Sequence, residues 1–329
     1  MKRPVAQIVG VGRALPKRVM KNAEFPAMGI DTSDEWIIER TGIRQRHIAG
    51  PGETVASMGA AAAKKAMEQA GVAAAELDAI ILCTSTPDRL LPAAAVDLQA
   101  KLGASRAAAF DIMAACAGWI YGLSLAEGLL ASGSAETVLV VGGEKMSTII
   151  NWTDRATCVL FGDGAGAVVL RKSRGGKGLL SVFMRSDGEL SNLLQRPKGG
   201  ATDPVTPELV ASRAHLVTME GRETFKHAVR SMAEACDRAL DGAKLANGDI
   251  DLLIPHQANV RIIEATAKHA NVPMDKVYVN VDHVGNTSAA SIPIALSEAM
   301  DTGRVPEGSA VMFVAFGAGL TWGSAIHRF

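Results

Sequence analysis

The chain has 329 residues, 48% of them hydrophobic, so it can bury a substantial core as one large domain or as two halves. Lys plus Arg and Asp plus Glu each number 34, which excludes a global electrostatic field that would attract nucleic acid or an anionic membrane. No apolar run reaches transmembrane length, and the first residues lack the apolar core of a signal peptide, so we expect a cytoplasmic protein.

Apolar runs of strand length alternate with helical segments along the chain, a pattern that predicts mostly parallel sheets with helical cover. We predict strands over residues 5–10, 77–84, 107–113, 137–141, 252–254, 278–281 and 310–315. We predict helices over residues 31–40, 55–70 and 93–102, after Cys116, and in an apolar segment that ends at Met300. The remaining predictions are an exposed basic loop at 41–47, two strands around a Gly-rich turn at 158–170, and a surface insertion at 198–212.

The second half of the sequence repeats the pattern of the first. Residues 70–82 resemble 241–254, the segment around Cys116 is echoed by 278–300, and Phe161-Gly-Asp-Gly is echoed by Phe316-Gly-Ala-Gly. A repeat this long predicts a duplicated α/β unit, because the repeats of a solenoid span only roughly 20–50 residues. We place the joint at 171–178, which divides the chain into halves of 1–174 and 175–329.

Four cysteines are widely spaced and form no C-x-x-C pair, so neither a metal site nor a disulfide framework is predicted. Among them, Cys116 precedes a segment, 117–131, whose only charge is Glu127, and which is therefore typical of a buried helix. The start of a helix favours an anion, which lowers the pKa of a thiol. We weigh a nucleophilic Cys116 against a small buried core residue, the more common state of a free cysteine.

Two more polar residues are expected at the same edge of the sheets. His256 follows the predicted strand 252–254, and Asn286 falls where the second half corresponds to Cys116. Active-site groups of α/β sheets collect at the carboxyl ends of strands. Each residue alone is more typical of a turn, but three on equivalent ends of a duplicated unit indicate a shared site.

A Cys-His-Asn set is compatible with two chemistries. In a papain-like hydrolase the Asn orients the imidazole, whereas in acyl transfer with carbon–carbon bond formation the His and Asn donate hydrogen bonds to an enolate. The local signature of the papain-like cysteine is absent, which favours acyl transfer.

Several motifs sharpen this interpretation: Ala115-Cys-Ala-Gly, Pro255-His-Gln-Ala-Asn, Gly285-Asn-Thr-Ser-Ala-Ala-Ser, Asp31-Thr-Ser-Asp-Glu-Trp-Ile, Thr41-Gly-Ile-Arg, Phe161-Gly-Asp-Gly-Ala-Gly and Phe316-Gly-Ala-Gly-Leu-Thr-Trp-Gly-Ser-Ala. Together they resemble the β-ketoacyl-acyl-carrier-protein synthase III family, thiolase-fold condensing enzymes that initiate bacterial type II fatty-acid synthesis. The resemblance runs from about Val5 to the C-terminus. It implies a duplicated thiolase-like α/β fold, layered αβαβα, with two mixed, mostly parallel sheets. Thiolases would carry a second cysteine in place of Asn286, and elongating synthases would carry a second histidine there, so both classes are disfavoured.

The resemblance also implies a mechanism. Cys116 would attack the thioester of acetyl-CoA or a similar starter and keep the acyl group while CoA leaves. Malonyl-acyl-carrier-protein would then lose CO₂, and neutral His256 and Asn286 would stabilise the enolate that attacks the acyl group. The oxyanion hole would consist of backbone N–H groups of Cys116 and of the loop Gly317, Ala318 and Gly319. Acyl-CoA is then a substrate, and no cofactor is expected.

Binding residues follow from the same resemblance. The CoA site would comprise Thr32, Trp36, Arg40 and Arg155, because Arg suits both phosphate and adenine stacking. The family's carrier protein is acidic, so this neutral chain needs a local basic patch, for which we propose Lys226, Arg230, Arg261 and Lys268 with the nearby Gln257.

The acyl pocket is assigned to Leu91 and Phe316. Many relatives that use acetyl-CoA have Phe in place of Leu91, and in them this position reaches the pocket across a homodimer interface. Since one such change in side-chain size discriminates between two starters by only about 1–3 kcal/mol, the identity of the acyl starter stays open. A secondary-metabolite starter ketosynthase of the same fold and a thioester hydrolase also stay open. A non-catalytic subunit of this fold would be expected to lack one of the three catalytic residues.

Overall fold

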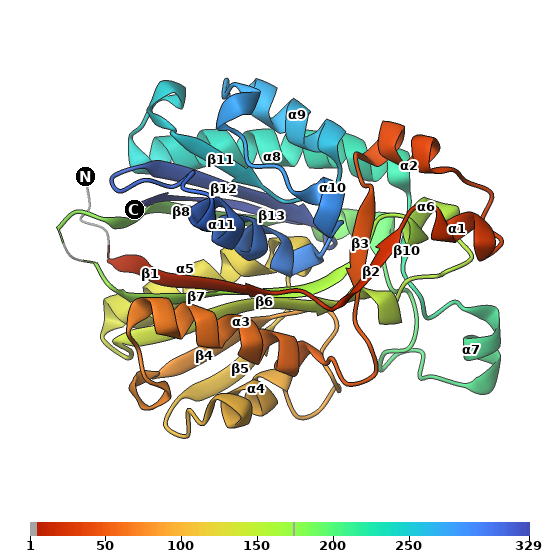
Figure 1. The fold of residues 1–329 in the computed structure, drawn as a ribbon, viewed down its shortest axis with the longest axis horizontal. Helices are drawn as coiled ribbons and strands as arrows, with labels where there is room; N and C mark the ends of the chain where they lie inside the picture. Colours follow the sequence, from red (N-terminus) through yellow and green to blue (C-terminus); the bar gives the residue numbers. More distant parts are fainter. Residues whose placement is uncertain (1–4, 174) are drawn as a thin grey trace.

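The computed structural model describes residues 5–173 and 175–329. Residues 1–4 and Arg174 lie outside this range. The first four belong to the N-terminal segment in which we predicted no signal peptide, and Arg174 belongs to the predicted joint. Figure 1 shows five layers in which two β-sheets alternate with helices.

The two sheets hold most of the strand residues. The first sheet has the order β1-β7-β6-β4-β5, with β1 Ala6–Ala14, β4 Ala79–Cys83, β5 Ala108–Ile112, β6 Thr137–Lys145 and β7 Asp163–Lys172. The second has the order β11-β12-β13-β8, with β8 Gly178–Ser186, β11 Leu252–Pro255, β12 Ala310–Gly317 and β13 Thr321–Arg328. Two small ribbons pair β2 Arg18–Lys21 with β3 Gln45–Ile48 and β9 Leu194–Gln195 with β10 Thr218–Met219.

The long helices form the other three layers. Helices α3 (Val55–Ala70) and α4 (Ala94–Leu102) cover the outer face of the first sheet, α8 (Gly221–Ala243) and α9 (Val260–His269) cover the second, and α5 (Gly118–Ser132) and α11 (Ser291–Asp301) lie between the sheets. The short helices are α1 Glu24–Ala27, α2 Asp34–Thr41, α6 Arg155–Cys158, α7 Pro207–Ser212 and α10 Val281–Val284. Single 3₁₀ turns include η2 Ala115–Ala117 and η7 Ser288–Ala290.

The predicted αβαβα layering is confirmed, but the sheets are less parallel than expected. Among the strands of the described residues, parallel pairing is confined to β4 with its neighbours β5 and β6 and to β11 with β12. Strands β1, β7, β8 and β13 join their sheets antiparallel, since β7 and β13 each run antiparallel to both of their neighbours. The strands of the first sheet all precede residue 174 and those of the second follow it, and the division into halves at this point stays a prediction.

The Gly-rich run 162–166 is not the turn that we predicted. It lies at the start of the single strand β7, and the residues before it form α6 rather than another strand. The glycines serve close packing: a Cβ on Gly166 would lie 2.6 Å from the backbone nitrogen of Ile294. Helix α11 can therefore pack directly on the β7 backbone because side chains are missing there.

Two other local predictions are wrong. Residues 41–47 do not form an exposed basic loop, because Gln45–Ile48 is strand β3 and Arg46 is fully buried. The guanidinium of Arg46 donates to Asn22 Oδ1 at 2.8 Å and to the Val159 carbonyl at 2.6 Å, and burial lowers its pKa to about 10. Residues 278–281 form no strand, since only a single bridge joins Val277 to β11 before α10 begins.

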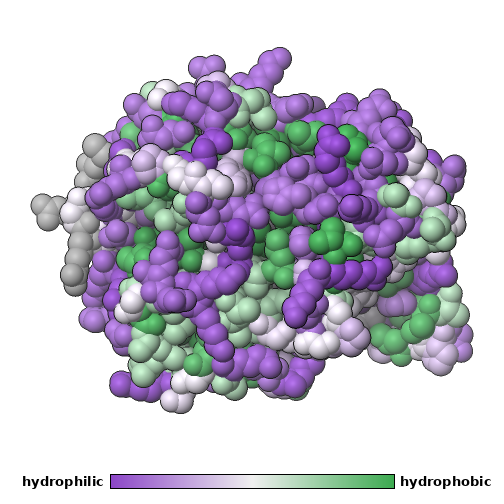
Figure 2. All heavy atoms as spheres, viewed as in Figure 1, coloured by the Kyte–Doolittle hydropathy of each residue, from purple (hydrophilic) through white to green (hydrophobic). Residues whose placement is uncertain are grey.

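The core follows the layers. Between the sheets, Trp119 of α5 packs edge-on against Phe313 of β12, with ring centroids 5.3 Å apart. Separate apolar clusters lie under α3 and α4 and under α8 and α9. Hydrophilic residues cover most of the face in Figure 2, with hydrophobic ones interspersed. The central layer is thus the apolar scaffold from which the turns η2 and η7 project.

Candidate active site

Cys116 lies on the turn η2, between the end of β5 and the start of α5. The residue before it, Ala115, has a φ of 44°, a left-handed conformation that an L-residue adopts at a cost of about 1–3 kcal/mol. The side chain of Cys116 is only 8% exposed. The fold therefore holds the thiol at the carboxyl end of a parallel strand, which is where such sheets collect reactive groups.

The protonation state of Cys116 differs from the expectation. Burial raises the pKa of the thiol to about 12, and the nearby Ser288 side chain only partly opposes this rise. The helix start was predicted to lower the pKa of the thiol, but desolvation of the charged form outweighs it. In the resting protein Cys116 is a neutral thiol that needs a base when it reacts.

Two cavities meet at Cys116. The narrower, of about 120 Å³, is mainly apolar and is also lined by His256, Asn286 and Phe316. The wider, of about 600 Å³, is also lined by Ser288, Ala318 and Gly319. A group bound to the sulfur can thus extend into one cavity while a second reactant approaches through the other.

His256 comes directly after β11, and its backbone N–H donates to the Val314 carbonyl at 2.8 Å. Its Nδ1 lies 2.6 Å from the hydroxyl of Ser291, the first residue of α11. Burial lowers the pKa of His256 to about 3. The imidazole is therefore neutral around neutral pH, with one ring nitrogen held by Ser291 and the other available for hydrogen bonding in the cavity.

The backbone of Asn286 is bonded on both sides to the segment just before β7. Its backbone N–H donates to the Leu160 carbonyl at 2.9 Å, and its carbonyl accepts from Gly162 N at 2.9 Å. Its side-chain Oδ1 accepts from Ser288 N at 2.9 Å. Because the oxygen is occupied, the amide N–H groups are the part of Asn286 that can bind a ligand in the cavity.

The sequence repeat correctly located the turn near Asn286, but it did not identify the residue that corresponds to Cys116. In both halves a 3₁₀ turn leads directly into a middle-layer helix, at Ala115–Ala117 and at Ser288–Ala290. Ala115 and Ser288 share a positive φ, of 44° and 50°. Cys116 therefore corresponds to Ala289, and Asn286 lies three residues before that position. The sequence pattern shows where a helix begins and therefore where the turn before it lies. It does not show which residue of that turn corresponds to Cys116, because this depends on the backbone angles.

The predicted oxyanion loop lies against the nucleophile. Gly317 ends β12, and a Cβ added there would lie 2.6 Å from the Cys116 nitrogen. Only glycine allows this approach of two backbones. Ala318 and Gly319 follow at the wall of the wider cavity, so the loop passes from the Cys116 backbone toward the place where an acyl oxygen could lie.

Three of the four residues predicted to bind CoA are brought together outside the narrow cavity. The guanidinium groups of Arg40 and Arg155 lie 4.4 and 4.6 Å from the Trp36 ring centre. The buried Thr32 hydroxyl has no hydrogen-bond partner in the described chain. Asn259, which lines the narrow cavity, donates to the Arg40 carbonyl at 2.9 Å. These contacts join an aromatic and cationic platform to the cavity that leads to Cys116.

The residues predicted to bind a carrier protein separate into three groups: the surroundings of Arg261, then Lys268, and then Gln257. Arg261 reaches across from α9 to within 5.8 Å of the Phe225 ring on α8, next to Lys226, and Arg230 is one turn further along the exposed face of α8. Lys226 is already paired with Glu223 at 2.7 Å. Lys268 is exposed near the far end of α9.

Gln257 cannot be a docking residue in this structure. It is 1% exposed, and its amide bonds the carbonyls of Pro255 and Tyr278 and the backbone nitrogens of Asn280 and Val281. A glutamine that follows a strand can turn inward to pair with a neighbouring loop, which its position in the sequence did not reveal. Gln257 supports the His256 turn from behind.

The two predicted acyl-pocket residues also separate. Phe316 lines the narrow cavity beside Cys116. Leu91 is 86% exposed and lines neither cavity of this chain, while its neighbour Leu90 lies at the rim of the wider one. Within a single chain Leu91 is therefore not an acyl-pocket residue, because its loop turns the side chain outward.

Sequence reasoning missed two residues beside the thiol. Ser288 lines the wider cavity with Cys116 and donates to the fully buried carboxylate of Glu144 at 2.9 Å. The available signal was a glutamate directly after the apolar strand residues 137–143, where solvent exposure is not expected.

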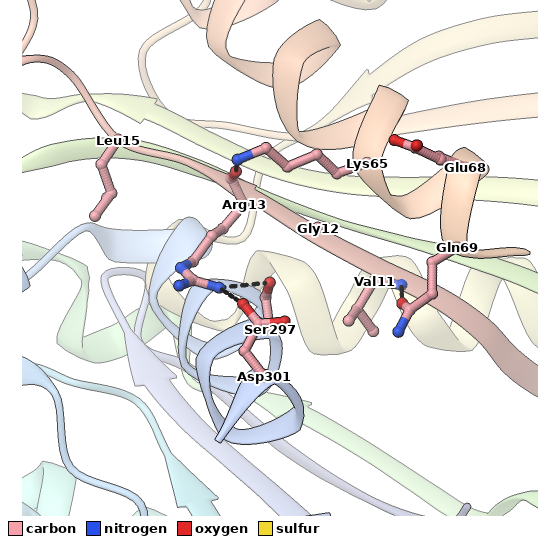
Figure 3. A pocket seen from close by; sticks show the side chains of 9 residues that line it. All are labelled: Val11, Gly12, Arg13, Leu15, Lys65, Glu68, Gln69, Ser297 and Asp301. Carbon is pink, nitrogen blue, oxygen red and sulfur yellow. Dashed lines mark hydrogen bonds and ion pairs between the residues drawn. The ribbon is translucent and has the colours of Figure 1, made fainter. Parts of the chain in front are cut away.

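Another hollow, shown in Figure 3, lies between β1, α3 and α11. Its polar side chains are engaged with one another, since Arg13 bonds Ser297 and Asp301 and Gln69 accepts from Val11 N. None of its lining residues is a cysteine or a histidine. Within the described residues, no group of His, Cys, Asp or Glu is arranged to hold a metal ion, and no helix is long and apolar enough to cross a membrane.

Comparison with known proteins defines the class of enzyme. Family models of 3-oxoacyl-[acyl-carrier-protein] synthase III and of its C-terminal part match residues 110–188 and 240–329. A relative from Roseiflexus castenholzii, named β-ketoacyl-[acyl-carrier-protein] synthase III, is 53% identical over 98% of both chains. The crystal structure of 3-oxoacyl-[acyl-carrier-protein] synthase III from Aquifex aeolicus is 46% identical, with a TM-score of 0.92, over 98% of this chain and 100% of the other. A priming β-ketosynthase from the R1128 polyketide pathway is 37% identical, with a TM-score of 0.91, over 99% of this chain and 97% of the other.

Fold and site together are those of a thiolase-like condensing enzyme, an acyltransferase. The chain belongs to the β-ketoacyl-[acyl-carrier-protein] synthase III family, which initiates fatty-acid synthesis, and the resemblance stated from the sequence motifs is confirmed.

Proposed function

We propose that this chain joins a short acyl-CoA starter, acetyl-CoA or similar, to malonyl-acyl-carrier-protein. The products are 3-ketoacyl-acyl-carrier-protein, CoA and CO₂, and the intermediate is an acyl group on Cys116. The observation that carries the proposal is the position of the Cys116 thiol, which lines a narrow cavity together with His256 and Asn286 and also opens to a wider one.

In the first half-reaction, the sulfur of Cys116 attacks the thioester carbonyl and CoA leaves. The backbone N–H of Cys116 and the Gly317 loop hold the negative oxygen of the tetrahedral intermediate. The contact between Gly317 and the Cys116 backbone supports this role, because the two segments converge on one point. Preorganised backbone donors of this kind contribute on the order of 10²–10³ in rate each.

In the second half-reaction, the malonyl group loses CO₂, and its electron pair forms an enolate that attacks the acyl-Cys116 carbonyl, after which the bond between the acyl carbon and the Cys116 sulfur breaks. His256 Nε2–H and the Asn286 amide donate to the enolate oxygen. For this the proton must be on Nε2, so that Nδ1 accepts from the Ser291 hydroxyl, which lies 2.6 Å away. The low pKa of His256 supports this role, since a neutral imidazole donates without changing the charge of the site.

The narrow apolar cavity suits the pantetheine arm that acyl-CoA and the carrier protein share. The Trp36 platform at Arg40 and Arg155 would then bind the nucleotide of CoA, and Arg261, Lys226 and Arg230 would attract the acidic carrier protein. Since both substrates are dissolved in the cytoplasm, we place the reaction there. The steps above need no cofactor.

We also propose that the chain works as a homodimer. Leu90, Leu91 and Met113 are 87%, 86% and 71% exposed, which is unusual for large apolar side chains. Leu90 and Met113 lie at the rim of the wider cavity. A second copy that covers this rim would bury all three and would allow Leu91 to approach the partner's acyl pocket.

The remaining alternative functions are distinguished by which acyl-CoA starter the chain uses and by which product it forms. The wider cavity of about 600 Å³ and the likeness to a polyketide priming enzyme favour a secondary-metabolite starter ketosynthase as the second candidate. The test incubates the chain with malonyl-carrier-protein and acyl-CoA starters from two to eight carbons, and detects CO₂ and ketoacyl products by mass spectrometry. Ketoacyl product from acetyl-CoA supports the proposal, product from longer starters alone supports the second candidate, and free acid without ketoacyl product would indicate a thioester hydrolase.

A further inference from the structure

Glu144 is a fully buried carboxylate at the end of β6, close to the nucleophile. It accepts hydrogen bonds from Thr84 Oγ1 at 3.3 Å, Thr86 Oγ1 at 2.5 Å, Ser85 N at 3.1 Å and Ser288 Oγ at 2.9 Å. All of these partners can donate, so the group is bonded as an ionised acceptor. Burial nevertheless raises its pKa to about 6, so Glu144 can take a proton more readily than an exposed carboxylate.

Ser288 connects this carboxylate to the thiol. Its hydroxyl has one proton, which it donates to Glu144, and its oxygen is then available to accept from Cys116. The Ser288 side chain lies near enough to the thiol to influence the pKa of Cys116, and both residues line the wider cavity. The Ser288 hydroxyl is thus placed to relay a proton from the S–H of Cys116 to the carboxylate of Glu144.

The position of Ser288 is set by the backbone around it. Its φ of 50° lies in the left-handed region, and its N–H donates to Asn286 Oδ1 at 2.9 Å. The strain indicates that the turn η7 is held in one conformation by its surroundings. Ser288 therefore presents its hydroxyl between Cys116 and Glu144, while its backbone fixes the amide that faces the enolate.

We propose that Glu144 accepts the proton of Cys116 through Ser288 when the thiol attacks the starter thioester. This inference rests on the proposed acyl transfer to Cys116. The S–H bond breaks as a new O–H bond forms on Ser288, whose own proton moves to Glu144. The electron pair left on sulfur forms the bond to the carbonyl carbon. When the CoA thiolate leaves, Glu144 returns its proton to Ser288, whose own proton passes to the CoA sulfur, so CoA departs as a thiol, Glu144 is ionised again and the charge of the site is unchanged.

Other groups are poorly suited to act as the base. At pH 7 a thiol with a pKa of about 12 is ionised in only about one molecule in 10⁵, so Cys116 cannot rely on spontaneous ionisation. His256 is held neutral by burial and is bonded at Nδ1 to Ser291. A proton shared between Cys116 and Glu144 requires no new charge in the buried site, whereas a charged imidazole would require one.

Two further titratable groups lie around Glu144. Cys83 on β4 is fully buried, and burial raises the pKa of its thiol, so it keeps its proton. Lys145, the next residue of β6, directs its ammonium to the carbonyls of Gly50 and Glu53, both at 3.0 Å. Neither group stands between Glu144 and Cys116.

The test measures the reactivity of Cys116 without any substrate. The purified chain is alkylated with iodoacetamide between pH 5 and 9, and the Cys116 peptide is quantified by mass spectrometry, which separates it from the other three buried cysteines. In the wild type the rate should rise through about pH 6, as Glu144 ionises, and then reach a plateau. In Glu144→Gln and Ser288→Ala the plateau should disappear. The rate at pH 7 should then fall at least about 100-fold and increase about tenfold per pH unit, as for an unassisted thiol.

Asp163→Asn is the matched control, because Asp163 is also a fully buried carboxylate that accepts from Ser147 and Ala49 but is not bonded to the Cys116 turn. It should keep the wild-type profile even if stability falls. A plateau with its midpoint near pH 6 in both Glu144→Gln and Ser288→Ala would overturn the relay. If Glu144→Gln does not fold, Ser288→Ala decides alone. Failure of the proposed condensation would instead appear as absent ketoacyl product in the wild type, whatever the alkylation profile.

Discussion

Gly317 lies against the backbone of Cys116, and the oxyanion hole of the proposed mechanism depends on this contact. A methyl group added at Gly317 would lie 2.6 Å from the Cys116 nitrogen, whereas ordinary contact begins at 3.4 Å. Since the obstructing atoms belong to the backbone, the Gly317 loop and Cys116 must separate by nearly 1 Å in Gly317→Ala. Misplacement by about 1 Å, or loss of one oxyanion donor, costs on the order of 100-fold in rate.

We therefore expect Gly317→Ala to slow transfer of the acyl group to Cys116 by about 100-fold, which corresponds to ~2.7 kcal/mol of transition-state stabilisation. The assay mixes the chain with acetyl-CoA, quenches at short times and follows the acyl-enzyme by intact-protein mass spectrometry. Gly323→Ala is the matched control. A methyl group at Gly323, on β13 of the same sheet, would meet the Phe183 carbonyl oxygen at the same 2.6 Å, but this position is away from Cys116.

Both variants should lose stability in thermal unfolding, by about 1–3 kcal/mol for an overpacked site, but only Gly317→Ala should lose the acylation rate. The reasoning is refuted if folded Gly317→Ala is acylated within about threefold of the wild-type rate, which is far smaller than the loss of one donor. Equal losses of rate in both variants would contradict it as well.

Three further outcomes are expected. Trp36→Ala should raise KM for acyl-CoA by about 5–30-fold, the equivalent of ~1–2 kcal/mol of stacking, without changing KM for an acyl-pantetheine that lacks the nucleotide. Arg261→Glu should raise KM for malonyl-carrier-protein by about tenfold, more so at low salt, and leave acylation by acyl-CoA unchanged; equal effects on both would argue against docking. Buried His327 accepts from Ile8 N at Nε2, and burial lowers its pKa to about 3 against an ordinary value near 6.5. The unfolded state then binds the extra proton as pH falls from about 6.5 to 3, so chemical denaturation should show the wild type losing up to ~1.4 kcal/mol per pH unit more than His327→Gln.

The motifs around Cys116, His256 and Asn286 predicted the fold and the family because each couples a reactive residue to the small residues that its turn requires. The glycine next to Asn286 has a φ of 75°, and Gly317 permits the contact with Cys116. These requirements are local, so they are visible in the order of residues.

Properties that depend on distant neighbours were not predictable in the same way. The pKa of Cys116 was expected to fall, and it rises because surrounding segments exclude water from the thiol. Arg46 was expected on the surface, but Asn22 and the Val159 carbonyl bind it in the interior. Gln257 was expected to meet a partner and instead bonds the backbone around Asn280. In each case a partner far along the chain decides the outcome.

The central claim is that Cys116 carries the acyl group and that His256 and Asn286 act on the malonyl group from the same cavity. The most direct measurement compares the wild type with Cys116→Ala, each given labelled acetyl-CoA and then malonyl-carrier-protein, and detects the labelled Cys116 peptide, CO₂ and ketoacyl product. The account predicts labelled Cys116 in the wild type, and in Cys116→Ala no label and no ketoacyl product but continued release of CO₂. Ketoacyl product formed by Cys116→Ala at the wild-type rate would contradict it.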